Sequence, residues 1–185
     1  MRNTYPTFQK DHLKDIEQYA ADVLSGKRPA NKYERLAVER ESRDLERAGT
    51  PEFPYYFDVE AVNKVIRFIE TFNHVKGKWA RAKGQESLIA LSPWQKWITA
   101  QVFGWKHITT KRRRFRTAFT LVPRKNGKST WVAPIGLYML ANDDEPAAEV
   151  FCGATTQKQA NEVFSPAKKM ATKQPIFRRR FSIEL

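Results

Sequence analysis

Four consecutive residues, Gly127, Lys128, Ser129 and Thr130, have the types and the order that phosphate chemistry requires. A glycine lets the backbone approach an anion closely, because it has no Cβ and adopts left-handed angles at little cost. A lysine after it places a charge on the β- and γ-phosphates, and the hydroxyl of the following serine is a ligand for Mg²⁺. The N–H groups of a helix that begins here add to the attraction. The tetrapeptide therefore predicts a phosphate-binding loop that uses magnesium.

The segments on both sides of this tetrapeptide are those that a phosphate-binding loop needs. Residues 115–122 are rich in aromatic and β-branched side chains, which predicts a buried strand. Pro123 ends that pattern, and the apolar run at residues 131–141 is long enough for a helix. The full motif G-x-x-x-x-G-K-[ST] is not met, because Val122 stands at the position of its first glycine. From these residues alone, a nucleotide site and a solvated basic turn capped by Ser129 both stay open.

Composition and charge favour an anionic partner. The 185-residue chain carries 33 Lys and Arg residues against 20 Asp and Glu residues, a formal net charge of +13 at pH 7. Such an excess favours nucleic acid as the partner. The single cysteine, Cys152, excludes an intramolecular disulfide and a cysteine-based metal site. There is no apolar core of a signal peptide and no run of the roughly 18–20 apolar residues that a membrane crossing needs, so we expect a cytosolic protein with no membrane partner.

The chain before residue 92 is expected to be helical. Apolar residues recur at helical spacing in residues 9–24, and further helices are predicted at residues 32–48 and after Asp58, a good N-cap. These helices contain no catalytic grouping.

The segment SPWQ, residues 92–95, predicts another helix start. Ser92 is a natural N-cap, Pro93 fits the first helical position, and Gln95 stands where it completes a capping box. This structural role explains Gln95 without a ligand. The amide of Gln95 is equally suited to pair with an adenine edge ahead of a phosphate loop, and both interpretations stay open.

A second buried strand is predicted at residues 148–154, followed by a helix in which Thr156 and Gln159 have capping-box spacing. Strand, helix, strand and helix in this order imply parallel strands with a right-handed crossover. Residues 181–185 are expected to begin a third strand. The predicted fold class is therefore α/β, with an N-terminal helical region followed by the first half of a parallel sheet and its flanking helices.

Two basic stretches contain no acidic residue. Residues 74–84 (HVKGKWARAKG) hold four basic residues and one tryptophan, and residues 106–116 (KHITTKRRRFR) hold six Lys or Arg residues. Each is suited to contact a phosphate backbone, and each is equally compatible with a solvated surface.

The second half of a phosphoryl-transfer site is not found in the sequence. Such sites need a carboxylate that holds Mg²⁺, and none of the acids after Lys128 ends an apolar strand. These acids are Asp143, Asp144, Glu145, Glu149, Glu162 and Glu184. We therefore expect the chain to be the front part of a longer protein and to be inactive as an ATPase alone.

Four segments, in their order along the chain, resemble the large subunit of tailed-phage terminase, the ATP-driven motor that packages DNA into proheads. They are SPWQ (residues 92–95), FGWK (residues 103–106), VPRKNGKS (residues 122–129) and CGATTQKQA (residues 152–160). VPRKNGKS is the most specific, because the phosphate loop of this family lacks the first glycine, so that Val122 is expected there. The N-terminal portion, with KYERLAVER, YYFD and HVKGKWA, looks like the helical leader of a prophage-type branch.

The resemblance implies roles for individual residues. Lys128 and Arg124 would be catalytic, with Arg124 near the γ-phosphate, and Ser129 would hold Mg²⁺ through its hydroxyl. The residues implied in binding ATP are Gln95, Arg124, Lys125, Asn126, Gly127, Lys128, Ser129 and Thr130. Gln95 would read the adenine, and coupling to DNA is implied for Thr155, Thr156 and Gln157.

The resemblance also implies a division of the chain and a set of partners. Residues 1–91 would form a helical leader region, and residues 92–185 the N-terminal part of a P-loop ATPase domain, truncated before the Asp-Glu strand and without the nuclease domain. The partners would be double-stranded DNA, the small subunit and the portal, in a homo-oligomeric ring of the full-length protein in the cytoplasm of the bacterial host. The alternatives are a fragment of another P-loop DNA translocase or helicase, and a basic DNA-binding module without nucleotide chemistry.

Overall fold

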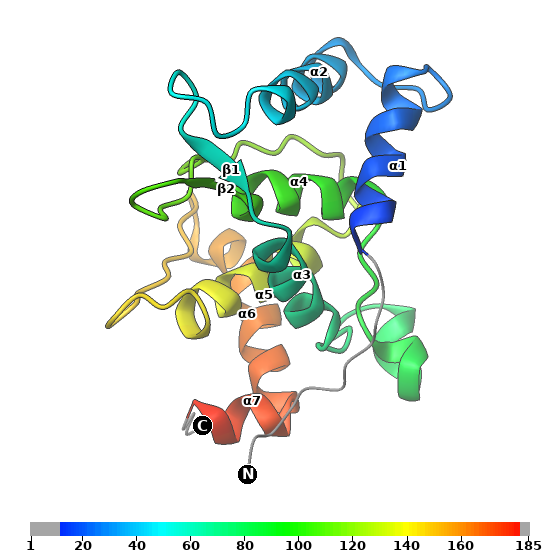
Figure 1. Cartoon of the computed structure of the whole chain (residues 1–185). Coiled ribbons are helices and arrows are strands. Elements are labelled where there is room, and N and C mark those ends of the chain that lie inside the picture. The colour runs from blue at the N-terminus through cyan, green and yellow to red at the C-terminus, as the bar shows by residue number, and fades with distance from the viewer. Residues whose placement is uncertain (1–11, 182–185) are drawn as a thin grey trace. The chain divides into compact units, whose positions relative to one another are not determined.

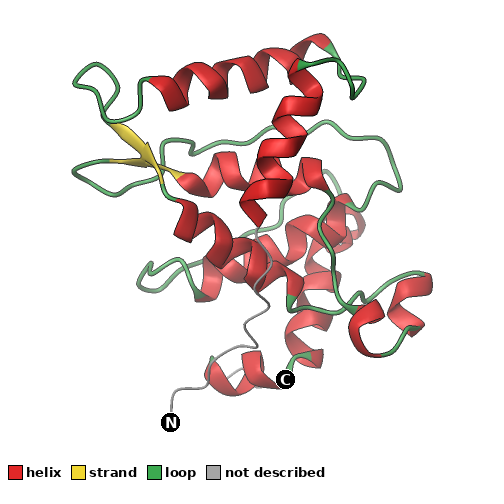
Figure 2. Cartoon of the chain, turned by 45° about the vertical axis from the view of Figure 1, so that its right-hand side comes forward, coloured by secondary structure: helices red, strands yellow, loops and turns green. Residues whose placement is uncertain are grey.

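The computed structural model describes residues 12–181, which are mainly helical (Figure 1, Figure 2). These residues fall into two compact units, each built from two stretches of the chain. The first unit contains residues 12–67 and 92–119, and the second contains residues 68–91 and 120–181. Helix α3 (Val59–Glu70) begins in the first unit and ends in the second.

The first unit combines helices with a small sheet. Its elements besides the start of α3 are α1 (His12–Leu24), α2 (Lys32–Glu46), β1 (Tyr55–Phe57), α4 (Pro93–Gly104) and β2 (Trp105–His107). Helix α1 packs against both α2 and α4. Strands β1 and β2 are antiparallel, with Tyr55 opposite His107 and Phe57 opposite Trp105. The buried side chains follow the helical period, as the sequence predicts, because one face of each helix removes its apolar surface from water.

Two charged side chains buried in the first unit have polar partners, as burial of an ionisable group requires. Glu41 accepts hydrogen bonds from the indole N–H of Trp97 and from the amide of Gln101, and the amide oxygen of Gln101 accepts from Trp105 Nε1 at 3.2 Å. Burial raises the pKa of Glu41, and these two hydrogen bonds offset only part of that rise. Lys96, which is 2% exposed, pairs with Asp15. These contacts join α1 and α2 to α4.

The second unit is built around an aromatic cluster. Its elements are the end of α3, the 3₁₀ turns η1 (Lys78–Arg81) and η2 (Gly84–Ser87), and the helices α5 (Lys128–Ala141), α6 (Gln157–Lys173) and α7 (Pro175–Arg180). The rings of Phe68, Phe72 and Phe177 lie within 5.1–5.9 Å of one another, and Tyr138 of α5 lies 5.4 Å from Phe68. Helix α6 packs along α5. The cluster therefore ties the end of α3 to α5 and α7.

The helices expected from the sequence are present. Helix α1 corresponds to the prediction at residues 9–24, of which residues 9–11 lie outside the described residues, and α2 corresponds to the prediction at residues 32–48. The carboxylate of Asp58 accepts a hydrogen bond from the N–H of Ala61 at 2.9 Å, which confirms its role as the cap of α3. Helices α4 and α6 begin at their predicted caps, Ser92 and Thr156. Helix α5 is present as well, but its N-cap is Gly127, so the cap considered at Ser129 is wrong. The short strands β1 and β2 and helix α7 were not predicted.

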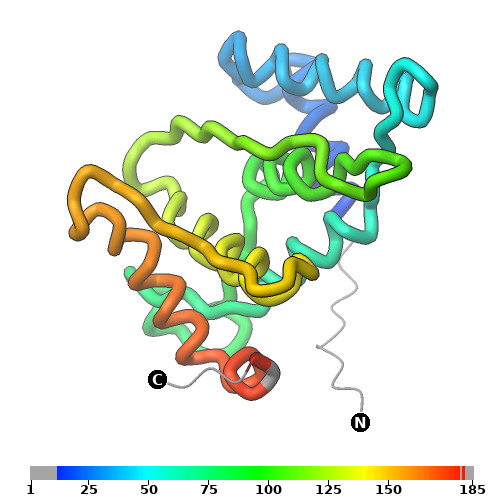
Figure 3. Tube along the Cα trace, turned by 90° about the vertical axis from the view of Figure 1, so that its left-hand side faces the viewer, coloured from blue at the N-terminus to red at the C-terminus, as the bar shows by residue number. Residues whose placement is uncertain are grey.

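The strands predicted at residues 115–122 and 148–154 are wrong for this structure, in which both segments are extended loops (Figure 3). Phe119 and Leu121 are 89% and 88% exposed, and Phe151 is 84% exposed. Among the described residues, no backbone group of either segment is hydrogen-bonded to another. An extended segment becomes a strand only when a neighbouring strand pairs with its N–H and C=O groups. The residue composition of a segment indicates its preference for extended backbone, but it does not show whether a second strand lies beside it.

The expected parallel sheet is accordingly not formed by the part of the chain that the structure describes, whose sheet is the antiparallel pair β1–β2. The third strand expected at residues 181–185 lies outside the described residues except for Phe181, which follows α7 in a turn. None of the described helices has both the length and the apolar character that crossing a bilayer requires.

Candidate functional site

The loop between residue 122 and helix α5 has the backbone of an anion site. Gly127 is the N-cap of α5 and adopts a left-handed conformation, with φ 72° and ψ 10°. Lys125 is also left-handed, with φ 69°, which is uncommon for a residue with a Cβ. Turns that contain left-handed residues direct successive N–H groups into a concavity that accepts anions. The Asn126 side chain closes the turn by donating to the carbonyl of Pro123 at 3.2 Å.

Helix α5 begins at Lys128, directly after this turn. The first helical hydrogen bond runs from the N–H of Trp131 to the carbonyl of Gly127 at 2.9 Å. The N–H groups of Lys128, Ser129 and Thr130 precede that bond and therefore have no partner within the helix. Aligned peptide dipoles add a partial positive charge at this end. The N-terminus of α5 can therefore bind a phosphate group.

The cations of the loop are available to a ligand. Arg124, Lys125 and Lys128 are exposed, and within the described part of the chain none of them pairs with a carboxylate. Three unpaired cations beside a helix N-terminus suit a polyphosphate, whose charge they would share. The donor set of the loop therefore fits the phosphates of ATP.

The loop offers fewer residues to Mg²⁺ than to the phosphates. Ser129 is half-buried in the first turn of α5, and its hydroxyl is the metal ligand that the sequence predicts. The described residues contain no cluster of three or more His, Cys, Asp or Glu side chains that could bind a metal ion. The Ser129 hydroxyl would therefore be one ligand of the ion, and phosphate oxygens and water would supply others.

Gln95 has the structural role that the sequence predicts for it. It is buried in the first turn of α4, and its amide oxygen accepts hydrogen bonds from the N–H of Ser92 at 2.9 Å and from the Ser92 hydroxyl at 3.0 Å. The capping-box interpretation is thus confirmed. Gln95 belongs to the first unit and the loop at residues 123–130 to the second. Its contact with adenine stays a prediction.

Thr155, Thr156 and Gln157 form the start of helix α6. The Thr156 hydroxyl accepts a hydrogen bond from the N–H of Gln159 at 3.3 Å, and the Thr155 hydroxyl donates to the side chain of Gln159. These contacts cap the helix, as the spacing of Thr156 and Gln159 predicts. All three predicted residues are exposed, and their coupling to DNA stays a prediction.

Some of the cations at residues 106–116 are paired with carboxylates inside the first unit. Lys106 pairs with Asp58 at 2.9 Å, and the guanidinium of Arg114 pairs with Asp44, which is 1% exposed. The same guanidinium lies 4.6 Å from the ring centre of Phe53 and 4.8 Å from that of Phe115. The structural interpretation therefore accounts for part of this stretch.

Asp44 is one of the buried charged residues that the sequence did not indicate. Burial by itself would raise its pKa, but hydrogen bonds and charge from Arg114 and Arg47 outweigh burial and hold the pKa of Asp44 below its usual value. The signal in the sequence is weak, because Asp44 lies among alternating charges of α2 and Arg114 is one of three consecutive arginines.

In a comparison with known protein families, residues 93–182 match a family model. The matching family is described as the terminase large subunit, ATPase domain. The matched residues include the loop at residues 123–130, Gln95 and the start of α6. No curated protein and no solved structure matches the chain.

Proposed function

Because residues 93–182 belong to the ATPase domain family of terminase large subunits, we propose that this chain is the nucleotide-binding front part of a phage DNA-packaging ATPase. The observation that carries the proposal is the loop at residues 123–130. There, left-handed Gly127 opens helix α5 and the next residue, Lys128, is a cation without a carboxylate partner among the described residues. A match to an ATPase domain implies use of a nucleotide, usually with Mg²⁺.

In the proposed complex, the loop binds the phosphates and its neighbours orient them. Lys128 contacts the β- and γ-phosphates, while the N–H groups at the start of α5 bind phosphate oxygens. Arg124 lies beside the γ-phosphate and stabilises the charge that develops there. Ser129 holds Mg²⁺ through its hydroxyl, and Lys125, Asn126 and Thr130 complete the loop. Gln95 reads the adenine edge.

The two extended segments support the proposed fold. Residues 115–122 and 148–154 have strand composition, yet Phe119, Leu121 and Phe151 are exposed. We propose that both segments become strands of a parallel sheet when neighbouring strands pair with them. The packaging activity then belongs to the full-length protein, and the 185-residue chain alone hydrolyses little or no ATP.

The proposed partners follow from the same family. The full-length protein would act as a homo-oligomeric ring on double-stranded DNA, with the small subunit and the portal, in the cytoplasm of the bacterial host. Thr155, Thr156 and Gln157 at the start of α6 would couple the nucleotide site to the DNA. Residues 1–91 would serve as the helical leader, and residues 92–185 as the first part of the ATPase domain.

Equilibrium binding of fluorescent ATP tests the proposal, with Lys128→Ala as the decisive variant. Loss of one hydrogen bond from a charged donor costs about 1.5–3 kcal/mol, so we expect binding to weaken by about 10- to 150-fold. The loss should be largest for ATP, smaller for ADP and absent for AMP, because Lys128 contacts only the outer phosphates.

Lys169→Ala is the matched control. Lys169 is an exposed lysine of helix α6 in the same unit, and its loss removes the same charge without touching the loop. ATP binding that is equally strong in the Lys128→Ala variant would refute the proposed site.

A further inference from the structure

A short basic turn in the second unit is not used by the proposed nucleotide site. We name residues 76–83 (KGKWARAK) the basic turn. It consists of the 3₁₀ turn η1 with its flanking residues, and Gly77 before η1 and Gly84 after it have positive φ angles of 74° and 59°. Left-handed glycines at both ends fix sharp changes of chain direction, so the turn projects as a compact loop.

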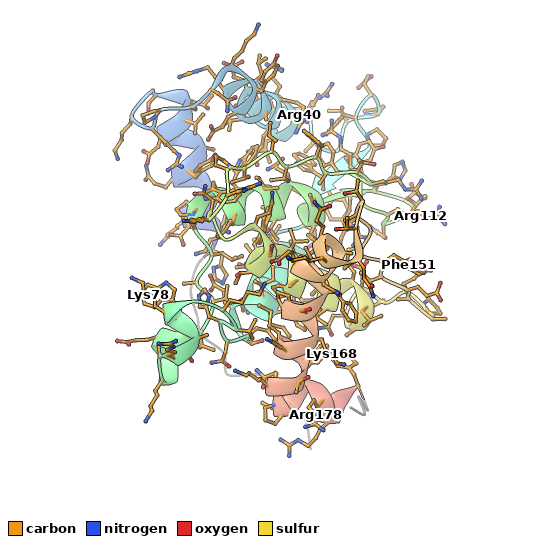
Figure 4. The ribbon with its side chains drawn as sticks, turned by 180° about the vertical axis from the view of Figure 1, so that it is seen from behind. Arg40, Lys78, Arg112, Phe151, Lys168 and Arg178 are labelled. Carbon is orange, nitrogen blue, oxygen red and sulfur yellow. The ribbon has the colours of Figure 1, made fainter. Side chains whose placement is uncertain are left out.

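The cations of the basic turn differ in their partners. Lys76 is held by Glu162 of α6 at 3.0 Å, which ties the turn to that helix. Lys78, Arg81 and Lys83 are exposed and have no carboxylate partner in the described part of the chain. Residues three apart in a 3₁₀ turn lie on the same side, so Lys78 and Arg81 present their charges along one edge. Figure 4 labels Lys78 on this turn.

A large aromatic side chain stands among these cations. Trp79 is 49% exposed. Its ring centre lies 4.7 Å from the ammonium group of Lys78 and 6.5 Å from the ring of His74. The indole is thus held beside its own cation by a cation–π contact, while about half of its surface faces solvent. It is the one large apolar side chain of the turn.

We propose that the basic turn binds single-stranded nucleic acid, with Lys78, Arg81 and Lys83 on the phosphates and Trp79 stacked on an unpaired base. An exposed aromatic ring within a basic surface is typical of proteins that bind single-stranded nucleic acid, because every base has a face on which a ring can stack. In a duplex those faces are covered by neighbouring base pairs. A membrane surface fits less well, since a single tryptophan with two alanines offers little apolar area for insertion.

This site is independent of the proposed nucleotide site and is tested without ATP. Fluorescence anisotropy of the full chain with labelled oligothymidylate measures the affinity, in parallel with a duplex of the same length. We expect tighter binding of the single strand. Trp79→Ala should weaken it by about 5- to 150-fold, the range found for loss of one stacking ring, while Trp79→Phe should restore most of the affinity.

The double variant Lys78→Ala/Arg81→Ala tests the phosphate contacts. Because each phosphate contact on a single strand contributes about −0.7 to the slope of log K against log[salt], we expect the slope to become shallower by about 1.4. Lys32→Ala/Arg43→Ala removes two exposed cations from α2 in the other unit and should leave the slope unchanged.

Three results would overturn the proposal. They are an affinity for oligothymidylate that does not change in Trp79→Ala, a duplex affinity above that of the single strand, and binding to anionic phosphatidylserine vesicles without binding to oligothymidylate. All these variants change exposed side chains, and circular dichroism of each verifies that the chain is folded.

Discussion

The two basic stretches of this chain look alike in sequence and differ in what their cations contact. In residues 106–116, Lys106 and Arg114 are paired with the carboxylates of Asp58 and Asp44. In the basic turn at residues 76–83, Lys78, Arg81 and Lys83 are exposed without such partners among the described residues. A count of charges treats the two stretches equally. The difference teaches that a cation indicates an anionic ligand only after its partners inside the protein are known.

The aromatic side chains near the cations also differ between the two basic stretches. The guanidinium of Arg114 lies within 6 Å of the ring centres of four aromatic side chains. These rings are those of Phe53, Tyr55, Trp105 and Phe115. In the basic turn, by contrast, the tryptophan ring itself faces solvent. The first arrangement stabilises the fold, and the second leaves both the charge and the ring available to a ligand.

The largest effect is expected for Asp44→Asn. This change leaves the guanidinium of Arg114 without its carboxylate in a largely buried position, and breaking such a pair destabilises a protein by about 3–5 kcal/mol. We expect a loss of about 3 kcal/mol in the free energy of unfolding, measured by urea titration. Glu46→Gln, at an exposed carboxylate of the same helix, is the control. Equal midpoints for the two variants would show that the Asp44–Arg114 pair does not stabilise the first unit.

A smaller loss is expected for Arg114→Lys, which keeps the charge. Lysine cannot reproduce the planar fork of the guanidinium or its stacking against the surrounding rings, so we expect destabilisation by about 1–2 kcal/mol, from several cation–π contacts of about 0.5–1 kcal/mol each. Arg112→Lys, two positions earlier and exposed, should change the urea midpoint little. If both lysine variants are equally stable, the charge alone determines the role of Arg114.

A pH titration isolates the electrostatic part of the same contact. Because the pKa of Asp44 is lower in the folded chain than in the unfolded chain, the unfolded chain binds more protons near pH 4, and stability rises with pH there. The stability that Asp44 contributes is therefore present above its unfolded pKa and is lost as pH falls through the folded one. The difference in unfolding free energy between the native chain and Asp44→Asn should shrink below about pH 4. A difference that is constant from pH 7 to pH 3 would contradict this.

Helices and strands of this chain were not equally predictable from the sequence. A helix satisfies its own backbone hydrogen bonds, so local signals suffice: the cap at Asp58 and the capping box of Ser92 and Gln95 lie where the spacing places them. A strand depends on a neighbour, and residues 115–122 and 148–154 have none among the described residues. Their composition therefore predicted a ladder that the structure lacks.

The candidate site was predictable to the extent that it is local. The sequence of residues 123–130 predicts the turn and the helix start, and the structure has both, with Gly127 left-handed at the N-cap of α5. The left-handed conformation of Lys125 was not predictable, because nothing in its residue type favours it. The partners of Asp44 were likewise beyond the sequence, since Arg114 is 70 residues away from it along the chain.

The smallest effect on stability is expected for substitutions in the basic turn. A comparison of these substitutions with Arg114→Lys distinguishes the two basic stretches most clearly. Lys78→Ala/Arg81→Ala removes two exposed cations that have no carboxylate partner among the described residues, and surface changes of this kind stay within about 0.5 kcal/mol each. We therefore expect a urea midpoint close to that of the native chain together with weakened binding of oligothymidylate. The Arg114→Lys variant should behave in the opposite way, with lower stability and unchanged affinity for the oligonucleotide. If instead the double variant is as destabilised as Arg114→Lys, the cations of the basic turn stabilise the fold, and the distinction between the two stretches fails.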